Sequence, residues 1–400
     1  MTDGDRKRLV RQGWQSRLDV LPMIPLGRGW VLNKRSDGAC VFLDENDRCL
    51  IHSRFGGDQK PLACRLFPFS IREVGDPAAA SPSSASAVQV TVRFDCPSVA
   101  RSEGVPLADH EASLSTLARE VRSEMPPVPA KGDIYLQPGR KATPLELHTV
   151  TGRLVSWLRS DHPFVEQAVG ASRFATLLGR TRLHDVDESE SLALMDLLAA
   201  EFEKEGERPV ASPLPKQAAM LRQLVFAHTE HVGLADMQAN WFRRMGKRLQ
   251  QAGTARRFLR GRGVVPAVPG LCGSTLFSRI AEVSVAREDL PFIDGLLRRY
   301  AQARLTGDSV YGDGYYGWPV AAGVSALFLS IAVIGFLSRS VCAAEGRTEV
   351  TGDDVVRATG AVDRAATRLP ALGTMAERTR IAYLWEDDGI ARLVRHFALA

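Results

Sequence analysis

Helical periodicity governs most of this 400-residue chain and limits the folds open to it. From about residue 107 onward, apolar side chains recur at spacings of three and four, as in amphipathic helices. A helical body of this length is long enough to bury its own core. The predicted helices span residues 107–125, 144–159, 162–178, 189–204, 215–231, 234–251, 290–303, 319–338, 351–368 and 375–397.

The first hundred residues follow a different pattern, with short strands and turns. Residues 40–43 and 48–51 flank a polar cluster at 44–47, which predicts a hairpin. A second hairpin is predicted from 67–74 and 88–94, because 88–94 alternates strictly between apolar and polar side chains. We therefore expect a mainly α protein. A large helical domain spans 106–400, and a small N-terminal module of irregular structure and β-hairpins spans 1–105.

Cysteine is unevenly distributed along the chain. Six cysteines in 400 residues are too sparse for a disulfide scaffold. The polar N-terminal stretch lacks the apolar core of a signal peptide, so we expect a cytoplasmic, reducing environment in which clustered thiols bind metal or do redox work. Four cysteines fall within the first quarter of the chain: Cys40, Cys49, Cys64 and Cys96.

Four thiolates can complete a tetrahedral zinc site or hold one iron–sulfur cluster. These cysteines have no C-x2-C knuckle, so the fold must gather them, and the second hairpin would bring Cys64 close to Cys96. Cys96 is followed by Pro97, as is a ligand cysteine in bacterial ferredoxin motifs. The alternative interpretation is that these are separate buried cysteines that behave as small hydrophobes.

The spacing and neighbours of the four cysteines resemble those of a known family. The matching segments are Cys40-Val-Phe-Leu, Cys49-Leu-Ile, Cys64-Arg-Leu-Phe-Pro and Asp95-Cys-Pro, within about residues 38–100. They look like the family of zinc- or iron-chelating cysteine-cluster domains, which includes the flagellin lysine N-methylases. The resemblance implies a metal site at Cys40, Cys49, Cys64 and Cys96. It favours an iron–sulfur cluster (4Fe–4S) over zinc, because the methylase is associated with such a cluster.

The chain also departs from the family pattern. Family members usually carry further cysteines, including an adjacent pair, upstream of the Cys-x-Phe-Leu segment, and none precedes Cys40 here. Either the natural chain starts earlier, or this member has lost those ligands. If the resemblance extends to activity, the reaction is methyl transfer from S-adenosylmethionine to a protein lysine, with flagellin as one candidate substrate. The sequence assigns no catalytic residue. The one G-x-G-x-x-G match, at 312–317, lies between predicted helices and is interpreted as a turn.

Charge is concentrated in one segment. The net charge of the chain is only +5, but residues 237–281 hold nine arginines and lysines and no acidic residue. This segment suggests an alternative function, a non-enzymatic, metal-stabilised binding module that contacts nucleic acid or another polyanion. The other interpretation, which we favour, is a solvated helix face and linker.

Three further features have two interpretations each. Residues 319–337 carry no charge and are long enough to span a membrane, but we interpret them as a buried central helix. His228 and His231 lie one turn apart and can share a metal, although polar residues at a helix end are the preferred interpretation. His52 is a candidate outer ligand of the cysteine site or a solvated loop residue.

Overall fold

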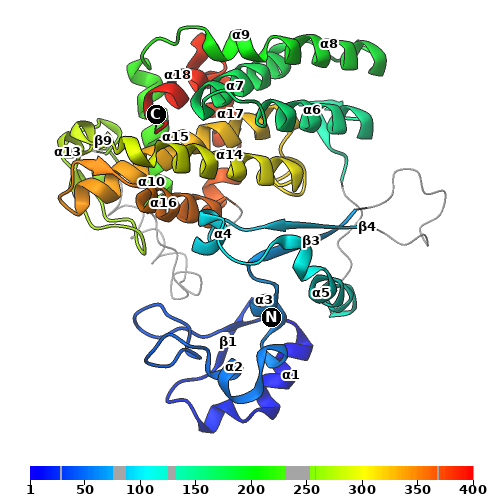
Figure 1. Ribbon diagram of the computed structural model, residues 1–400, viewed down its shortest axis with the longest axis vertical. Coiled ribbons are helices and arrows are strands. Elements are labelled where there is room, and N and C mark those ends of the chain that lie inside the picture. The colour runs from blue at the N-terminus through cyan, green and yellow to red at the C-terminus, as the bar shows by residue number, and fades with distance from the viewer. Residues whose placement is uncertain are drawn as a thin grey trace. The chain divides into compact units, whose positions relative to one another are not determined.

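The computed structural model describes residues 1–27, 29–74, 87–124, 132–229, 253–256, 258–366 and 369–399, and these fall into two compact units (Figure 1). The N-terminal unit comprises Met1–Arg93 and Gly104–Pro129, and the helical unit comprises Phe94–Glu103 and Ala130–Ala400. The sequence places a single boundary near residue 105. In the structure the helical unit instead takes in Phe94–Glu103, and the N-terminal unit resumes at Gly104 and extends to Pro129.

The N-terminal unit combines short helices with two hairpins. The pairing of β3 with β4 runs from Phe69 opposite Val92 to Val74 opposite Ala87, which confirms the predicted second hairpin. Its elements are α1 (Asp3–Arg11), β1 (Met23–Leu26), β2 (Gly29–Leu32), α2 (Leu50–Phe55), α3 (Leu62–Leu66), β3 (Phe69–Val74), β4 (Ala87–Val92) and α5 (Glu111–Glu124).

The first predicted hairpin is partly wrong. The turn at 44–47 forms, with the Asp44 N–H donating to the Arg48 carbonyl at 2.9 Å and Asp47 in the left-handed region. Strand pairing stops at the single bridge between Leu43 and Cys49. The chain then turns into α2, because Ile51 is buried when the segment is helical. The second strand expected at 48–51 is therefore the start of a helix.

Buried aromatic and aliphatic side chains form the core of the N-terminal unit. The Trp14 ring packs edge-on against Phe42, with 5.2 Å between ring centroids. The Trp14 indole N–H donates to Gln12, whose own amide donates to the Gln59 carbonyl at 3.2 Å, so α1 is attached to the segment before α3. The other members of this core are Leu9, Met23, Val41 and Ile51.

The helical unit confirms the mainly α prediction. Most predicted helices are present, while 234–251 lies entirely outside the described residues. Its helices are α4 (Pro97–Arg101), α6 (Pro144–Trp157), α7 (Phe164–Arg180), α8 (Glu188–Ala200), α9 (Phe202–Glu207), α10 (Pro215–Thr229), α13 (Phe277–Glu282), α14 (Leu290–Thr306), α15 (Val320–Ala344), α16 (Gly352–Ala365), α17 (Met375–Leu384) and α18 (Gly389–Phe397). Its short strands are β5 (Tyr135–Gln137), β6 (Arg140–Lys141), β7 (Val264–Val265), β8 (Thr275–Leu276), β9 (Ser284–Val285) and β10 (Glu349–Val350).

Two long predicted helices are each broken in the structure. The segment 189–204 divides into α8 and α9 at Glu201. The segment 375–397 divides into α17 and α18, because Asp387 and Asp388 both adopt positive φ values of 50° and 57°. Apolar periodicity continues across both breaks, so the pattern alone does not reveal them.

Helix α15 is the centre of the helical unit. It packs against α7, α14, α16 and α18, which lie together in Figure 1. It is the one described helix long and apolar enough to cross a membrane, and 89% of its most apolar window is buried inside the protein. This confirms the interpretation of 319–337 as a buried core helix. Two glycines allow the closest contacts of this helix. A Cβ on Gly323 would lie 1.7 Å from the Val310 carbonyl oxygen, and a Cβ on Gly335 would lie 1.8 Å from the Phe397 carbonyl oxygen.

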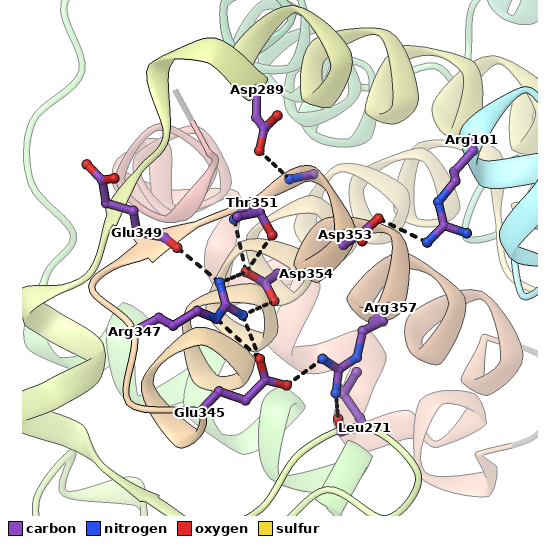
Figure 2. A network of polar contacts seen from close by, with 11 residues as sticks. Arg101, Leu271, Asp289, Glu345, Arg347, Glu349, Thr351, Asp353, Asp354 and Arg357 are labelled. Carbon is purple, nitrogen blue, oxygen red and sulfur yellow. Dashed lines mark hydrogen bonds and ion pairs between the residues drawn. The ribbon is translucent and has the colours of Figure 1, made fainter.

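A polar network joins the end of α15 to the start of α16 (Figure 2). The buried Asp354 carboxylate accepts from Arg347 at 2.5 Å and from the Thr351 N–H at 2.9 Å. The same carboxylate accepts from the Thr351 hydroxyl at 3.2 Å, and Figure 2 shows both bonds from Thr351 to Asp354. Glu345 accepts from both Arg347 and Arg357. The loop between the two helices is thus held by paired charges.

Candidate metal centre

Cys40 follows a tight turn and packs against the core of the N-terminal unit. The turn is closed by the Arg35 N–H, which donates to the Ala39 carbonyl at 2.8 Å, with Gly38 at a φ of 87°. Such a φ favours glycine, which has no Cβ to clash with the backbone. A backbone bridge then pairs Cys40 with Lys34, and the Cys40 side chain contacts the core.

Cys49 lies at the other end of the neighbouring turn, immediately before α2. The Asp44 carboxylate closes this turn by accepting from the N–H groups of Asn46 and Arg48, both at 2.9 Å. The hydrogen bond from the Arg48 N–H is the main reason why the pKa of Asp44 is lowered. Cys49 occupies the N-cap position of α2, and its side chain packs against the same core as Cys40.

Cys64 lies in the middle of α3, which a buried carboxylate attaches to α1. Asp5 is completely buried and accepts from the Leu62 N–H at 2.9 Å. Arg8 pairs with the same carboxylate at 2.9 Å, so Asp5 is buried as part of an ion pair. One turn further, Arg65 forms a two-pronged ion pair with Glu120 of α5. Helix α3 is thus held from both sides, and Cys64 is the most exposed of the three thiols.

Neighbouring thiols affect the ionisation of Cys40 and Cys64. Burial is the largest cause of the raised pKa of Cys64, which reaches about 11, and the Cys40 and Cys49 thiolates contribute to the rise. Burial also raises the pKa of Cys40, again with a contribution from the charge of Cys49. Lys34, Arg35 and Lys60 oppose these shifts. A bound cation would reverse the effect, because metal coordination stabilises the thiolate form.

Cys96 lies in the helical unit, whereas the other three expected ligands lie in the N-terminal unit. It occupies the N-cap position of α4, with Pro97 as the first helical residue. The buried Asp363 of α16 accepts hydrogen bonds from the N–H groups of Phe94 and Asp95, at 2.9 and 3.3 Å. These bonds attach the backbone that leads into Cys96 to the helical core.

The three cysteines of the N-terminal unit do not meet the spacing expected of a single-ion site. The Sγ atoms of Cys40, Cys49 and Cys64 do not all lie within 4.8 Å of one another. Among the described residues, only one group of three possible ligands lies that close together, and it contains no cysteine. Thiolates that share one tetrahedral zinc ion lie ~3.8 Å apart, given Zn–S distances of about 2.3 Å. In a cubane cluster each thiolate binds a different iron, so its sulfurs are farther apart.

The other sequence candidates lie elsewhere or outside the described residues. His52 is exposed on α2, and Arg65 is paired with Glu120. Gly312–Gly317 forms a compact turn between α14 and α15, in which the Gly312 N–H donates to the Trp318 carbonyl at 2.8 Å, so this G-x-G-x-x-G does not follow a strand. His231 and residues 237–252 of the basic segment fall outside the described part of the chain.

A small cavity in the helical unit gathers four polar side chains, of which the sequence singles out only His228. It has a volume of about 30 Å³ and is lined by four polar residues among apolar ones: His228, Tyr315, Ser330 and Glu377. His228 Nδ1 lies 3.0 Å from the Leu224 carbonyl oxygen, and burial lowers the pKa of this imidazole. A cavity of this volume holds about two water molecules and is too small for a nucleoside-sized cofactor.

Comparisons of the chain with family models, characterised proteins and solved structures find no significant match.

Proposed function

We propose that the N-terminal unit binds a metal–thiolate centre through Cys40, Cys49 and Cys64, and that this centre is an iron–sulfur cluster. One observation carries the proposal. The three cysteines belong to three separate local structures, a turn, a helix start and a helix, yet Cys40 and Cys49 pack against one core and both lie close enough to Cys64 to help raise its pKa. Isolated cysteines used as small hydrophobes have no need for this proximity.

The local architecture supports a ligand role for these thiols. Cys40 and Cys49 pack on one side against the Trp14 core, which restricts water near the sulfurs. Cys64 is more exposed, so a cluster would be accessible at that ligand. Lys34, Arg35 and Lys60 lie near the thiols and offset the negative charge of a thiolate-ligated cluster.

The resemblance of the four cysteine segments to the cysteine-cluster family favours iron–sulfur over zinc within this proposal. Zinc would require the three sulfurs to move to ~3.8 Å from one another, whereas a cubane accepts a wider spacing. Cys96 is the fourth ligand expected from the sequence. The metal content of a Cys96→Ser variant decides whether Cys96 binds the metal.

The proposal is tested with single serine substitutions at the three cysteines of the N-terminal unit. We expect Cys40→Ser, Cys49→Ser and Cys64→Ser each to lose the visible absorbance and most of the iron of the anaerobically purified chain. Cys272→Ser is the matched control, because Cys272 is a half-buried free cysteine of the helical unit. Cys96→Ser is measured in parallel, and equal loss of iron would add Cys96 to the ligand set.

Two results would contradict the proposal. Stoichiometric zinc with no iron in the wild-type chain would overturn the iron–sulfur assignment. Metal content that is unchanged in all three substituted chains would overturn the ligand assignment altogether. Circular dichroism of each variant shows whether a loss of metal reflects lost ligands or lost helical structure.

A further inference from the structure

We propose that His162, Glu203 and Glu207 form a second metal site, for a divalent first-row transition ion, on the helical unit. Among the described residues these three place their ligand atoms within 4.8 Å of one another. One imidazole nitrogen and two carboxylates form a donor set that such ions accept, with water in the remaining positions. This site is separate from the cysteines, and it does not depend on the function proposed for them.

The hydrogen bonds around His162 determine which ring nitrogen carries the proton. The Ser160 hydroxyl donates its one proton to the Trp157 carbonyl at 2.8 Å. The same oxygen lies 3.0 Å from His162 Nδ1, and while the hydroxyl donates to Trp157 it accepts from a protonated Nδ1. In the neutral imidazole this leaves the Nε2 lone pair free, which is the form that binds metals.

The free lone pair points at another acceptor. His162 Nε2 lies 3.3 Å from Glu203 Oε1, and Glu207 is one turn further along α9. A neutral nitrogen and two carboxylates that face one another repel unless a positive charge lies between them. Either a proton on Nε2 or a metal ion supplies that charge, and the three-donor arrangement favours the ion.

The imidazole is held in this orientation by buried groups. Gln167 is completely buried, and its amide donates to the Ser160 carbonyl at 2.9 Å and to the Ser160 hydroxyl at 3.1 Å. The His162 ring also packs against Trp157, with 4.8 Å between centroids. Hydrogen-bonded partners of this kind orient metal-binding histidines, and their loss costs roughly 10–100-fold in metal affinity.

The two glutamates are presented by a helix whose position is equally restricted. Helix α9 packs closely on α7, since a Cβ on Gly206 would lie 2.7 Å from the Glu166 carbonyl, and one on Gly170 would lie 2.7 Å from that of Phe202. Glu203 and Glu207 remain exposed, while His162 is half-buried. A hydrated ion can therefore reach donors that are already in place.

Mn²⁺ is the probe, because this hard cation prefers carboxylate and imidazole donors to thiolates. Binding to the full chain is followed by the loss of the free Mn²⁺ signal in electron paramagnetic resonance. We expect one ion per chain, with affinity reduced at least tenfold in His162→Ala and in Glu203→Gln/Glu207→Gln. Ser160→Ala should reduce the affinity by about tenfold through the imidazole orientation.

Glu188→Gln is the control, since Glu188 is an exposed residue of α8 outside the site, and its affinity should match the wild type. The substituted glutamates are exposed, so these variants should fold normally. The absence of any stoichiometric site in the wild-type chain would overturn the proposal. Equal Mn²⁺ affinity in the wild-type chain and in Glu203→Gln/Glu207→Gln would also overturn the proposal, because the ion would then bind without these two carboxylates.

Discussion

The Asp363 carboxylate accepts a hydrogen bond from the Phe94 N–H at 2.9 Å, although 269 positions separate the two residues in the sequence. Asp363 also accepts from the next N–H, that of Asp95, and lies 3.7 Å from the Arg304 guanidinium. Both Asp363 and Phe94 are buried. This carboxylate therefore fixes the start of the segment that carries Cys96, within the helical unit.

We expect Asp363→Ala to lower the free energy of unfolding by about 3 kcal/mol, because it leaves buried N–H groups without an acceptor and a guanidinium without its partner. Asp363→Asn keeps one acceptor oxygen and should cost less. Urea denaturation measures both. Asp353→Ala removes an exposed ion pair with Arg101 and should cost at most about 1 kcal/mol. A similar cost for Asp353→Ala and Asp363→Ala would contradict this account.

Gly335 allows the end of α18 to approach α15. A Cβ at this position would lie 1.8 Å from the Phe397 carbonyl oxygen, so Gly335→Ala must displace one of the two helices. We expect a loss of about 3 kcal/mol in the free energy of unfolding. Gly152→Ala in α6 meets no atom within 4 Å and should stabilise the protein by up to about 1 kcal/mol. Opposite signs for the two substitutions are the decisive result in thermal or urea denaturation.

Arg347 is the counter-charge of the buried Asp354. Removing Arg347 leaves a carboxylate of 1% exposure with only hydrogen bonds to compensate its burial. We expect Arg347→Ala to cost about 2 kcal/mol, a value reduced because Arg347 itself is partly exposed. Arg357→Ala removes an exposed partner of Glu345 in the same network and should cost less than about 1 kcal/mol. Equal stability losses would show that burial of Asp354 is not the controlling factor.

Glu377 should make stability depend on pH. Burial raises the pKa of Glu377 above the ordinary value of 4.5, with the Arg380 guanidinium opposing the rise. The folded protein therefore holds this proton more tightly than the unfolded chain does. Its stabilising effect is fully present below the unfolded pKa and is lost as the pH rises through the folded pKa.

The permanently neutral Glu377→Gln removes this dependence. Between about pH 4 and about pH 7, the stability of Glu377→Gln should rise relative to wild type, by about 1.4 kcal/mol for each unit of pKa difference. Urea denaturation of both proteins at the two pH values measures the change. The exposed Glu188→Gln is the control, and its stability difference from wild type should not vary with pH. A parallel pH profile for Glu377→Gln and wild type would contradict the assignment.

Local signals in the sequence were sufficient for much of the fold. The alternation in 88–94 predicted β4 and its pairing with β3, and the apolar spacing within 351–368 predicted α16. Helix α1 was missed although the sequence contains its signal, a capping box formed by Thr2 and Asp5. Local periodicity works for such elements because neighbouring residues alone determine it.

The candidate sites depend on contacts that local patterns do not contain. The attachment of α3 by Asp5 joins residues 57 positions apart, and nothing near Cys64 indicates it. The proximity of His162 to Glu203 arises from the close packing of α7 and α9. The N-cap position of Cys49 was mistaken for a strand, because a short apolar run fits both structures.

The iron and acid-labile sulfide content of the full chain, purified without oxygen, decides whether Cys40, Cys49 and Cys64 hold an iron–sulfur cluster. We expect ~4 iron and ~4 sulfide per chain, with visible charge-transfer absorbance that is lost in Cys64→Ser but retained in Cys272→Ser. A colourless chain that contains neither iron nor sulfide, and that takes up none when both are supplied under reducing conditions, would contradict the cluster assignment.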